Sequence, residues 1–256
     1  MTGSGARSLD NRVAIVTGGS RGIGKALCIG LAAAGARVVV SARSAGSCAE
    51  VVADIAASGG VAIAVPLDVG TEAGRTELVE RAVADFGGID VLVNNAAVLK
   101  PHETIKVREE ELDSIIDVNL KAPVFLSACA FPYLKRSGRG SIINISALGA
   151  HHPIAGIGAY CAVKAALENW TTTMAMEWTR QGVRVNSLVP GPVGTDMILP
   201  RDENARERFV EKMASETLRG RIAEPKELVG AAVFLASDDS ALMTGRSLFM
   251  DGGMFA

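Results

Sequence analysis

The sequence has few aromatic residues, no strong net charge and no long apolar run, and each lack argues against a class of protein. Only 4% of the 256 residues are aromatic, and the formal net charge is −2 without a long run of one sign. This balance argues against nucleic acid or an anionic membrane surface as the main partner. No uninterrupted apolar run reaches the roughly 18 residues that a membrane-spanning helix needs. We therefore expect neither a nucleic-acid-binding protein nor a membrane protein.

Cysteine and histidine are also sparse. The cysteines lack CxxC or metal-ligand spacing and are expected to be free thiols in a reducing compartment: Cys28, Cys48, Cys129 and Cys161. The histidines are too few for a metal cage: His102, His151 and His152. Residues 1–10 are small and polar and lack the apolar core of a secretory signal, so we expect a flexible tail there. Together these features predict a cytoplasmic protein without a bound metal.

Hydrophobic residues make up 48% of the chain, and most of them are small and aliphatic. They alternate between strand and helix patterns, which predicts an α/β fold. We expect a single Rossmann-type, doubly wound parallel sheet of about seven strands with helices on both faces, forming one domain over residues 11–256. The predicted strands are 13–16, 37–43, 61–65, 89–93, 141–146, 183–189 and 247–250. The predicted helices are 25–34, 50–57, 72–86, 108–136, 159–181, 201–218 and one that begins near residue 225.

The predicted helix 201–218 lies outside the regular alternation. It follows the carboxyl end of a strand, where lids over ligand sites lie in this class of fold. We therefore expect a lid near residues 192–218, with an apolar wall offered by the neighbouring Met197, Ile198 and Leu199.

A glycine-rich turn lies between the first predicted strand and the first predicted helix. It reads Thr17-Gly18-Gly19-Ser20-Arg21-Gly22-Ile23-Gly24, with the spacing G-x-x-x-G-x-G. Glycines let a backbone turn tightly and approach a phosphate, and the helix end offers free N–H groups with a positive dipole. The strand before the turn and the helix after it favour a nucleotide-binding site.

The end of the second predicted strand carries arginine in place of an acid. It reads Ser41-Ala42-Arg43-Ser44, whereas NAD-binding folds place a carboxylate near this point to bind the ribose hydroxyls. Arg21 lies in the glycine-rich turn as well. Two guanidinium groups suit a 2′-phosphate, which arginine binds bidentately, so we expect NADP rather than NAD. The alternative is that both arginines are ordinary solvated side chains.

Small or polar residues follow the third and fourth predicted strands. Asp68 and Val69 follow the third strand, where an acid and a backbone carbonyl could hold an adenine edge. Asp68 could instead cap the helix that begins near Thr71. Asn95 and Ala96 follow the fourth strand, which suits a backbone packed close to a cofactor or a plain polar turn.

A tyrosine and a lysine stand four positions apart in the predicted helix 159–181. Tyr160 and Lys164 would share one face of that helix. A free phenol has a pKa near ~10, and a nearby ammonium group lowers it. The pair is therefore a candidate proton shuttle, although a core tyrosine beside a surface lysine has the same spacing. In an earlier predicted helix, Asn119 is mildly unfavourable, and the nearby Pro123 can disturb the helix.

In this order and at these intervals, the motifs resemble those of the classical short-chain dehydrogenase/reductase family, in its 3-oxoacyl-carrier-protein-reductase-like form. The resemblance covers nearly the whole chain after the tail. The motifs that carry it are Thr17-Gly18 with Gly22-Ile23-Gly24, Leu67-Asp68-Val69, Asn94-Asn95-Ala96, Asn119, Tyr160 with Lys164, Pro190-Gly191 with Thr195, Thr244-Gly245 and Asp251-Gly252-Gly253.

The resemblance implies an NADP(H)-dependent oxidoreductase that interconverts a small-molecule ketone and a secondary alcohol by hydride transfer. Tyr160 would exchange the proton, Lys164 would hold the nicotinamide ribose and lower the pKa of Tyr160, and Asn119 would hold a relay water. Val193 and Thr195 would anchor the nicotinamide amide. The resemblance also implies a homotetramer or homodimer. The expected cofactor contacts are Gly18, Ser20, Arg21, Gly22, Ile23, Gly24, Arg43, Asp68, Val69, Asn95, Ala96, Tyr160, Lys164, Pro190, Gly191, Val193 and Thr195.

The sequence departs from the family pattern at two positions. Ala97 replaces the glycine that usually follows Asn-Asn-Ala, which predicts a small change in pocket shape. The family's catalytic serine lies thirteen residues before the tyrosine, and that position is Ala147 here. Ser146 stands one residue earlier, and a one-residue step along a strand turns the side chain to the opposite face.

Three explanations of this departure stay open. A one-residue loop insertion could return Ser146 to the catalytic site, in keeping with its Ser-x-x-Gly spacing to Gly149. Another donor (His151, His152 or a water) could polarise the substrate. Alternatively, the chain is an NADP-binding sensor or scaffold with little turnover, since loss of one such donor costs about 10²–10³ in rate in a comparable oxyanion site.

Overall fold

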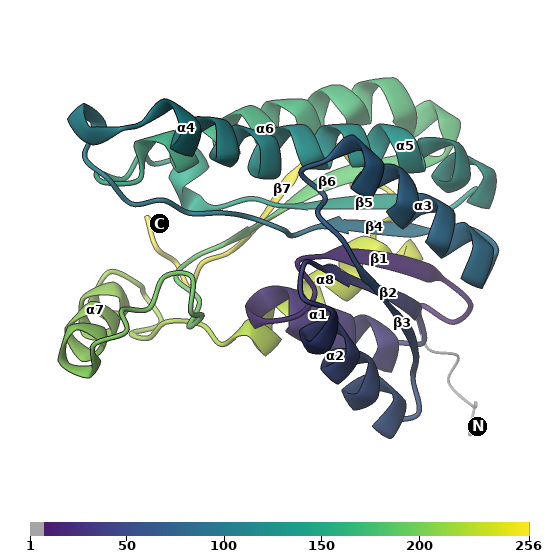
Figure 1. Cartoon of the computed structure of the whole chain (residues 1–256), viewed down its shortest axis with the longest axis horizontal. Helices are drawn as coiled ribbons and strands as arrows, with labels where there is room; N and C mark the ends of the chain where they lie inside the picture. Colours follow the sequence, from purple (N-terminus) through teal and green to yellow (C-terminus); the bar gives the residue numbers. More distant parts are fainter. Residues whose placement is uncertain (1–7, 256) are drawn as a thin grey trace.

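Parallel strands form one central sheet, with helices packed on both of its faces (Figure 1). The computed structural model describes residues 8–255 of the chain. The strands are β1 (Val13–Thr17), β2 (Arg37–Ala42), β3 (Val61–Pro66), β4 (Val91–Asn94), β5 (Gly140–Ile145), β6 (Val183–Pro190) and β7 (Ser247–Met250). Their order in the sheet is β3-β2-β1-β4-β5-β6-β7, so the direction in which strands are added reverses between β1 and β4. This confirms the doubly wound parallel sheet predicted from the sequence.

Each face of the sheet closes its own hydrophobic core beneath a layer of helices (Figure 1). The α-helices of the described chain are α1 (Gly22–Ala33), α2 (Ala45–Ala57), α3 (Glu72–Phe86), α4 (Glu109–Ile116), α5 (Ala122–Ser137), α6 (Gly158–Trp178), α7 (Glu203–Ser215) and α8 (Val229–Ala236). One core lies under α1, α2 and α8, and the other under α3, α5 and α6. Along β1, Ala14 and Val16 enter the first core and Ile15 the second, because successive strand side chains point to opposite faces.

The described chain begins with a buried turn, which corrects part of the predicted flexible tail 1–10. Leu9 is fully buried in the core under α1 and α8, and its N–H donates to the carbonyl of Ala34 at 3.0 Å. Full burial of a leucine side chain contributes about 1.5–3 kcal/mol, which stabilises this turn. Residues 1–7 of the predicted tail lie outside the described residues.

The helix predicted at 108–136 is divided around Asn119. It consists of α4, a π-helical turn η2 (Asp117–Lys121) and α5, and Pro123 lies in the first turn of α5. The local disturbance expected near Pro123 is therefore confirmed. The extra residue in a π turn changes the direction of the side chains it carries, and such turns are frequent at functional sites.

Two other helices begin differently from the sequence prediction. The helix expected at 50–57 begins at Ala45, because Ser44 caps it by accepting a hydrogen bond from the N–H of Ser47. The last helix, expected from residue 225, opens with a 3₁₀ turn, η5 (Pro225–Leu228), before α8.

The stretch Glu109–Ser137 is long and apolar enough to cross a membrane, by length and composition alone. It is not an uninterrupted apolar run, because acidic and basic residues occur within it. In the structure this stretch covers part of the sheet, and Leu126, Ala130 and Leu134 are buried in the core. Length and hydropathy alone are weak evidence for a membrane span, since the core helix of a globular protein passes the same test.

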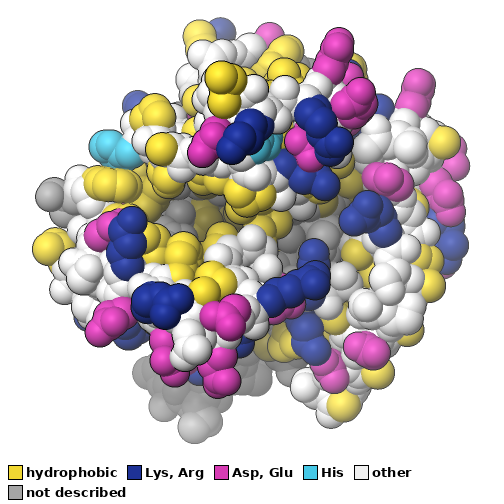
Figure 2. All heavy atoms as spheres, turned by 60° about the vertical axis from the view of Figure 1, so that its left-hand side comes forward, with side chains coloured by type: hydrophobic (Ala, Val, Ile, Leu, Met, Phe, Trp, Pro, Cys, Tyr) yellow, Lys and Arg dark blue, Asp and Glu magenta, His cyan; other side chains and the backbone are white. Residues whose placement is uncertain are grey.

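The molecule is hollowed at the carboxyl ends of the strands, between the parts that carry α4 and α7 (Figures 1 and 2). Figure 2 shows hydrophobic side chains lining much of this hollow, with basic and acidic side chains around its border. No residue of α7 is buried, so this helix forms one side of the hollow without joining the core. Ligands of open α/β sheets bind at this end, where the strand order reverses.

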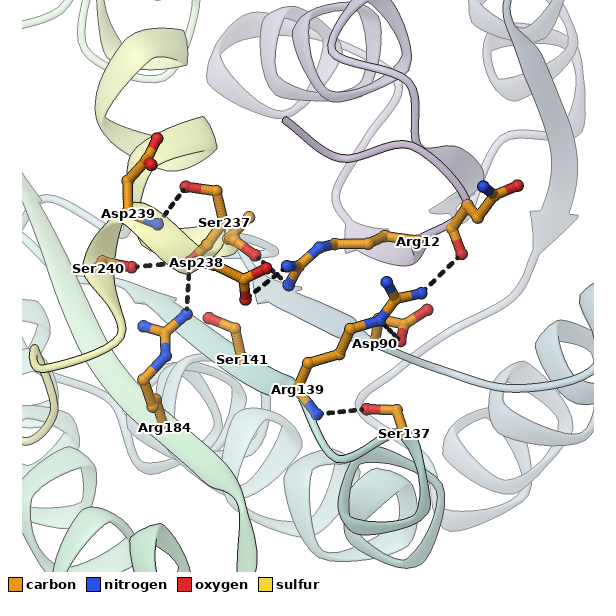
Figure 3. Close-up of polar contacts among 12 residues, drawn as sticks. Arg12, Asp90, Ser137, Arg139, Ser141, Arg184, Ser237, Asp238, Asp239 and Ser240 are labelled. Carbon is orange, nitrogen blue, oxygen red and sulfur yellow. Dashed lines mark hydrogen bonds and ion pairs between the residues drawn. The ribbon is translucent and has the colours of Figure 1, made fainter. Parts of the chain in front are cut away.

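A polar network ties the opposite, amino end of the sheet together (Figure 3). Arg12 is only 2% exposed, pairs with the Asp238 carboxylate at 2.7 Å and donates to the carbonyl of Ala236 at 2.9 Å. Beside it, Arg139 pairs with Asp90 at 2.9 Å. The network connects the start of β1 with the end of α8, far along the sequence.

Candidate active site

The glycine-rich turn forms a tight cradle between the end of β1 and the start of α1. Gly18 and Gly22 have positive φ angles of 63° and 53°, a conformation that residues with a Cβ rarely adopt. A Cβ at Gly24 would lie 2.1 Å from the carbonyl oxygen of Gly18. Arg21 precedes α1 and provides no side-chain cap, so the first N–H groups of the helix remain for an anionic ligand.

The cradle is fastened to the end of β4 by two side chains. The Thr17 hydroxyl accepts hydrogen bonds from the N–H groups of Asn95 and Ala96, both at 3.0 Å. The Asn95 amide donates to the carbonyls of Thr17 at 2.9 Å and Gly18 at 3.2 Å. Asn95, predicted as a cofactor contact, thus shapes the glycine-rich turn. The role of Thr17 was not predicted, because its signal in the sequence is limited to its place at the end of a strand beside the first glycine.

Two arginines lie near the cradle, at the end of β2 and in the turn itself. Arg21 and Arg43 are exposed, and within residues 8–255 neither side chain forms an ion pair. The N–H of Gly19 donates to the carbonyl of Ser41 at 2.9 Å, which joins the turn to the end of β2. Ser20, between Gly19 and Arg21, is half-buried. This arrangement leaves two positive charges without internal partners beside a backbone cradle.

The residues that follow β3 differ in burial and in their hydrogen bonds. Asp68 is exposed, and its carboxylate accepts a hydrogen bond from the N–H of Gly70 at 2.8 Å. Thr71, and not Asp68, caps α3 by accepting from the N–H of Gly74, which corrects the capping alternative for Asp68. Val69 is buried in the core under α3.

Lys164 is buried beside Tyr160 at the start of α6. Its side chain is 2% exposed, and its ammonium donates to the carbonyl of Ile145 at 2.6 Å and lies 5.7 Å from the centre of the Tyr160 ring. Burial lowers the pKa of Lys164 to about 8, while Glu168 acts in the opposite sense. The structure thus places Tyr160 and Lys164 together, and the core position belongs to the lysine.

Burial raises the pKa of Tyr160, and Cys161 adds to this effect. Lys164 was expected to lower the pKa of Tyr160, and the direction is corrected for this arrangement. Because the ammonium is directed at the Ile145 carbonyl, its attraction for the phenolate does not outweigh the cost of desolvating that charge. Tyr160 is accordingly held in its neutral form, with the proton available for donation.

Asn119 lies on the π-helical turn η2 and is 1% exposed. Its carbonyl oxygen accepts from the N–H of Val98, and its amide donates to the carbonyl of Val98, both at 2.8 Å. This paired contact fixes the loop that follows β4. The contact with Val98 was not predicted, since a backbone partner 21 residues away leaves no mark in the sequence. The relay water expected at Asn119 stays a prediction.

Ser146 and Ala147 directly follow β5. The N–H of Ser146 donates to the carbonyl of Leu188 at 2.9 Å, but its buried hydroxyl has no hydrogen-bond partner within the described chain. Ala147 has an extended backbone, with φ −161° and ψ 155°, so its side chain points away from that of Ser146. Ser146 is therefore enclosed in the protein, and the geometry does not favour the loop insertion that would present it to a substrate.

The two histidines considered as alternative donors lie farther along the same loop. Both are exposed, and each contacts an aromatic ring: His151 contacts Phe249 at 4.9 Å between ring centres, and His152 contacts Phe255 at 4.4 Å. They belong to the rim of the site.

The segment after β6 approaches the start of α1. A Cβ at Gly22 would lie 3.2 Å from the Thr195 methyl carbon, so Thr195 neighbours the glycine-rich turn. Val193 is buried and pairs with Ala223. Gly191, after Pro190 at the end of β6, passes so close to Asp251 that a Cβ would lie 2.6 Å from its Cα. The predicted motif residues 190–195 therefore complete the edge of the cradle.

These features fit a dinucleotide cofactor with a 2′-phosphate. The glycine cradle would be filled by any added Cβ, the N-terminus of α1 is free of a side-chain cap, and two unpaired guanidinium groups lie beside them. Ile23 continues the cradle into α1 and is half-buried. Within residues 8–255, no three or more His, Cys, Asp or Glu side chains are grouped so that they could hold a metal.

Comparisons with known proteins agree with this geometry over nearly the whole chain. Residues 18–255 match the family model described as enoyl-(acyl carrier protein) reductase. The chain is 36% identical to a 2,5-dichloro-2,5-cyclohexadiene-1,4-diol dehydrogenase of Sphingobium indicum, over 97% of this chain and 98% of that protein. It is 35% identical to a 3-oxoacyl-[acyl-carrier-protein] reductase of Vibrio cholerae, over 97% of this chain and 99% of that protein.

Solved structures give the same result. A 3-oxoacyl (acyl-carrier-protein) reductase of Agrobacterium tumefaciens with NADP bound is 35% identical, with a TM-score of 0.92 over 97% of this chain and 96% of that one. A protein of Beutenbergia cavernae described as an NAD(P)-dependent gluconate 5-dehydrogenase, also with bound NADP, is 35% identical with a TM-score of 0.91, over 98% of this chain and 99% of that one.

Proposed function

Since this chain belongs to the short-chain dehydrogenase/reductase family of oxidoreductases, we propose that it interconverts a ketone and a secondary alcohol with NADP(H), using Tyr160 as acid and base. One observation carries the proposal. Lys164 is buried with its ammonium fixed on the Ile145 carbonyl beside the Tyr160 ring, at the edge of the sheet that carries the glycine cradle. A buried lysine beside a half-buried tyrosine is costly and suits a proton-transfer site better than a purely structural one.

The cofactor contacts follow from the cradle. Arg21 and Arg43 would pair with the 2′-phosphate, and the free N–H groups of α1 would bind the diphosphate. NADP bound in two similar structures supports this choice. When bound, NADPH supplies the hydride. The remaining expected contacts are Gly18, Ser20, Gly22, Ile23 and Gly24 in the turn, Asp68, Val69, Asn95 and Ala96 after β3 and β4, and Pro190, Gly191, Val193 and Thr195 after β6.

Tyr160 would donate its phenolic proton to the substrate oxygen in reduction and take the proton from the alcohol in oxidation. Its raised pKa keeps it protonated at neutral pH, which suits donation. Lys164 would bind the ribose hydroxyls of the cofactor and stabilise the phenolate that donation leaves behind. Asn119 would hold the loop after β4 against this site.

Ala147 supports a second candidate function, an NADP-binding sensor or scaffold with weak turnover. It carries no hydroxyl where the family places its catalytic serine, and the hydroxyl of Ser146 is enclosed. Loss of one oxyanion-type donor costs about 10²–10³ in rate. We propose that the chain retains catalysis at a lowered rate, with the polarising hydrogen bond supplied by Tyr160 alone or with a water.

Turnover of NADPH with a panel of ketones, and of NADP⁺ with secondary alcohols, tests the proposal. We expect Tyr160→Phe to lose about 10²–10⁴ in kcat, the typical contribution of a general acid, while NADPH still binds. Ala147→Ser should raise kcat by about 10²–10³. Undetectable turnover in both wild type and Ala147→Ser, with intact NADPH binding, would favour the sensor. Full activity of Tyr160→Phe would overturn the assignment of the acid.

The choice of NADP has its own test. Calorimetric titration should give tighter binding of NADPH than of NADH, and Arg21→Ala with Arg43→Ala should remove the difference while leaving NADH binding intact. Equal affinities of the wild type for the two nucleotides would refute the role given to these arginines.

We further propose that residues 192–218, which contain α7, act as a lid over the site. The support is that α7 contributes no buried residue to either of the two large cores and packs on the protein through the half-buried Met213, so its displacement would break few contacts.

A further inference from the structure

The segment Asp251–Phe255, which we call the C-terminal segment, leaves β7 and lies against the residues that follow α7. It turns at Gly252 and Gly253, whose φ angles are 70° and 80°. The carbonyl of Gly252 accepts a hydrogen bond from the N–H of Arg219 at 3.0 Å. A Cβ at Gly253 would lie 2.8 Å from a methyl carbon of Leu218. The C-terminal segment is therefore packed against the protein, and close contacts with residues 218 and 219 determine its conformation.

Met254 connects this segment to the catalytic tyrosine. It is 7% exposed and packs with Leu148 and Val189, with Met213 of α7 beside them. Leu148 follows Ala147 directly, and its neighbour Gly149 packs on Cys161, where a Cβ would lie 2.7 Å from the sulfur. Cys161 is the residue after Tyr160. One layer of side chains thus separates the C-terminal segment from the turn of α6 that carries the proposed acid.

Beyond Met254, the segment ends in an exposed aromatic contact. The Phe255 ring is 4.4 Å from the His152 ring, with their planes tilted by 33°, although Phe255 keeps 52% of its surface exposed. Ile154, on the same loop as His152, is 41% exposed. Both segments follow the carboxyl ends of strands, β5 and β7, at the edge of the sheet where the hollow lies, and exposed apolar side chains at such an edge suit a ligand-binding surface.

The walls near this contact lack charge. The loop 147–158 contains no lysine, arginine, aspartate or glutamate, and neither do residues 197–200 or 252–255. An anionic substrate would be bound best by a cation at the wall, since a charged hydrogen bond is roughly twice as strong as a neutral one. Aromatic side chains instead favour stacking or edge contacts with another ring. Figure 2 shows the largely hydrophobic lining of the hollow.

We infer that Phe255 and His152 form the substrate-selecting wall of the site, and that the substrate is a neutral ketone or secondary alcohol whose reacting carbon carries a cyclic or aryl group. The inference rests on the proposed function for the reacting carbonyl or alcohol group, and it adds the chemical class of the remainder of the substrate. Sugar acids and carrier-bound anionic substrates are disfavoured on the same grounds. In the reaction the carbonyl carbon gains hydride from NADPH, and the oxygen gains the proton of Tyr160.

The test compares kcat/KM for three ketones of similar size: acetophenone, 2-octanone and the anion 5-oxohexanoate. The wild type is expected to prefer acetophenone by about two- to tenfold over either, since an aromatic contact adds about 0.5–1.5 kcal/mol beyond the area it buries. Phe255→Ala should lose most of this preference through KM, and Phe255→Tyr should retain it. Phe234→Ala, an exposed phenylalanine on α8, is the matched control and should leave the preference unchanged.

A binding measurement separates this inference from the proposed function. Saturation-transfer NMR on the NADP⁺-loaded protein should detect 1-phenylethanol with the wild type and a weaker signal with Phe255→Ala and His152→Ala. Ring binding that depends on these residues, without turnover of any ketone, would sustain the wall and overturn the reaction. Faster turnover of 5-oxohexanoate than of acetophenone, or equal turnover of acetophenone and 2-octanone in both wild type and Phe255→Ala, would refute the role of Phe255 and His152 in substrate selection. Either result would leave the proposed reaction supported.

Discussion

Lys164 combines a full positive charge with a position inside the core. The protein acceptor of its ammonium is a neutral carbonyl, that of Ile145, which compensates only part of the loss of hydration. The consequence is a pKa lowered from 10.5 to about 8. At neutral pH the group is still mainly charged, so it can act on Tyr160 and on a bound ribose.

The buried position of Lys164 predicts how the free energy of unfolding changes with pH. Its pKa is lower in the folded than in the unfolded chain, so the unfolded chain binds more protons between the two values and the folded state gains stability as pH rises. From pH 8 to 10 the gain is roughly 2 kcal/mol. Chemical denaturation at both values should show that the stability of wild type relative to Lys164→Met rises by this amount. The comparison cancels Tyr160 and Cys28, whose raised pKa values act in the opposite sense in both proteins. A difference between the two proteins that does not change with pH would contradict it.

At the residue scale, the spacing of Tyr160 and Lys164 predicted that they share one face of a helix, and the structure places the two side chains together. The direction of the tyrosine pKa shift was wrong, because it depends on burial and on where the ammonium points, and neither is written in a four-residue interval. The partner of Lys164 is a backbone oxygen on another strand. Pattern reasoning cannot identify a backbone acceptor whose contact is made only in the fold.

At the scale of elements, the turn between β1 and α1 is held by close backbone approach. The position of Gly24 admits no Cβ, since the nearest atom would be a carbonyl oxygen at 2.1 Å, whereas Gly46 in α2 has no atom within 4 Å of such a Cβ. The two glycines look alike in the sequence and differ in what surrounds them.

Gly24→Ala should therefore open the turn and weaken NADPH binding at least about tenfold, with a lower melting temperature, because overpacking costs about 1–3 kcal/mol. Gly46→Ala is the control and should leave NADPH binding unchanged while stabilising the protein by up to about 1 kcal/mol, as alanine is the better helix former. Fluorescence titration of NADPH and thermal melting check both. Unchanged affinity of Gly24→Ala would show that the cradle does not bind the nucleotide.

Strands and helices followed from the hydrophobic pattern because the inner strands are buried on both faces and most helices bury one face, whereas the edge strands β3 and β7 and the helix α7 are more exposed. The breaks in that pattern were harder to place. The start of α2 depends on the Ser44 cap, and the division between α4 and α5 depends on a π turn around Asn119. Both depend on which local hydrogen bonds form, and the sequence shows only which residues could form them.

At the scale of the molecule, the network at the amino end of the sheet joins residues more than 200 positions apart. Arg12 is buried, whereas its partner Asp238 is 80% exposed, and Arg12 holds the pKa of that carboxyl below its usual value. The start of the first strand is thus linked to the end of α8 by one ion pair and by one hydrogen bond to a backbone carbonyl.

Asp238→Asn should destabilise the fold by about 1–3 kcal/mol, the range for a hydrogen bond to a charged group. The carboxylate contribution is present above pH 3.8, the ordinary pKa of the group, and is lost as pH falls through the lowered value. Asp239→Asn removes a neighbouring carboxylate outside the ion pair and should cost less than about 0.5 kcal/mol. Urea denaturation at pH 7 measures both, and equal losses would remove the role given to Arg12.

Several large apolar side chains lie exposed on the outer faces of α5 and α6 and near β7. They are Phe125, Trp170, Met176 and Leu242. Exposed aromatic and methionine side chains are enriched at protein interfaces, so we propose a homodimer or homotetramer that uses these faces. Light scattering coupled to size exclusion should give a multiple of 26.5 kDa. Trp170→Glu and Leu242→Glu should reduce it, whereas Leu218→Glu, beside the C-terminal segment, should not. A monomeric wild type at micromolar concentration would contradict the proposal.

The anchor of Lys164 also bears on how this protein can change over generations. The carbonyl oxygen at position 145 is present whatever the side chain there, and Ile145 itself serves as core filling at 5% exposure. A valine or leucine at this position would keep the strand and therefore the anchor. The geometry of Lys164 thus depends on the backbone conformation of β5, and position 145 can be substituted by other aliphatic residues without loss of the carbonyl that anchors the lysine.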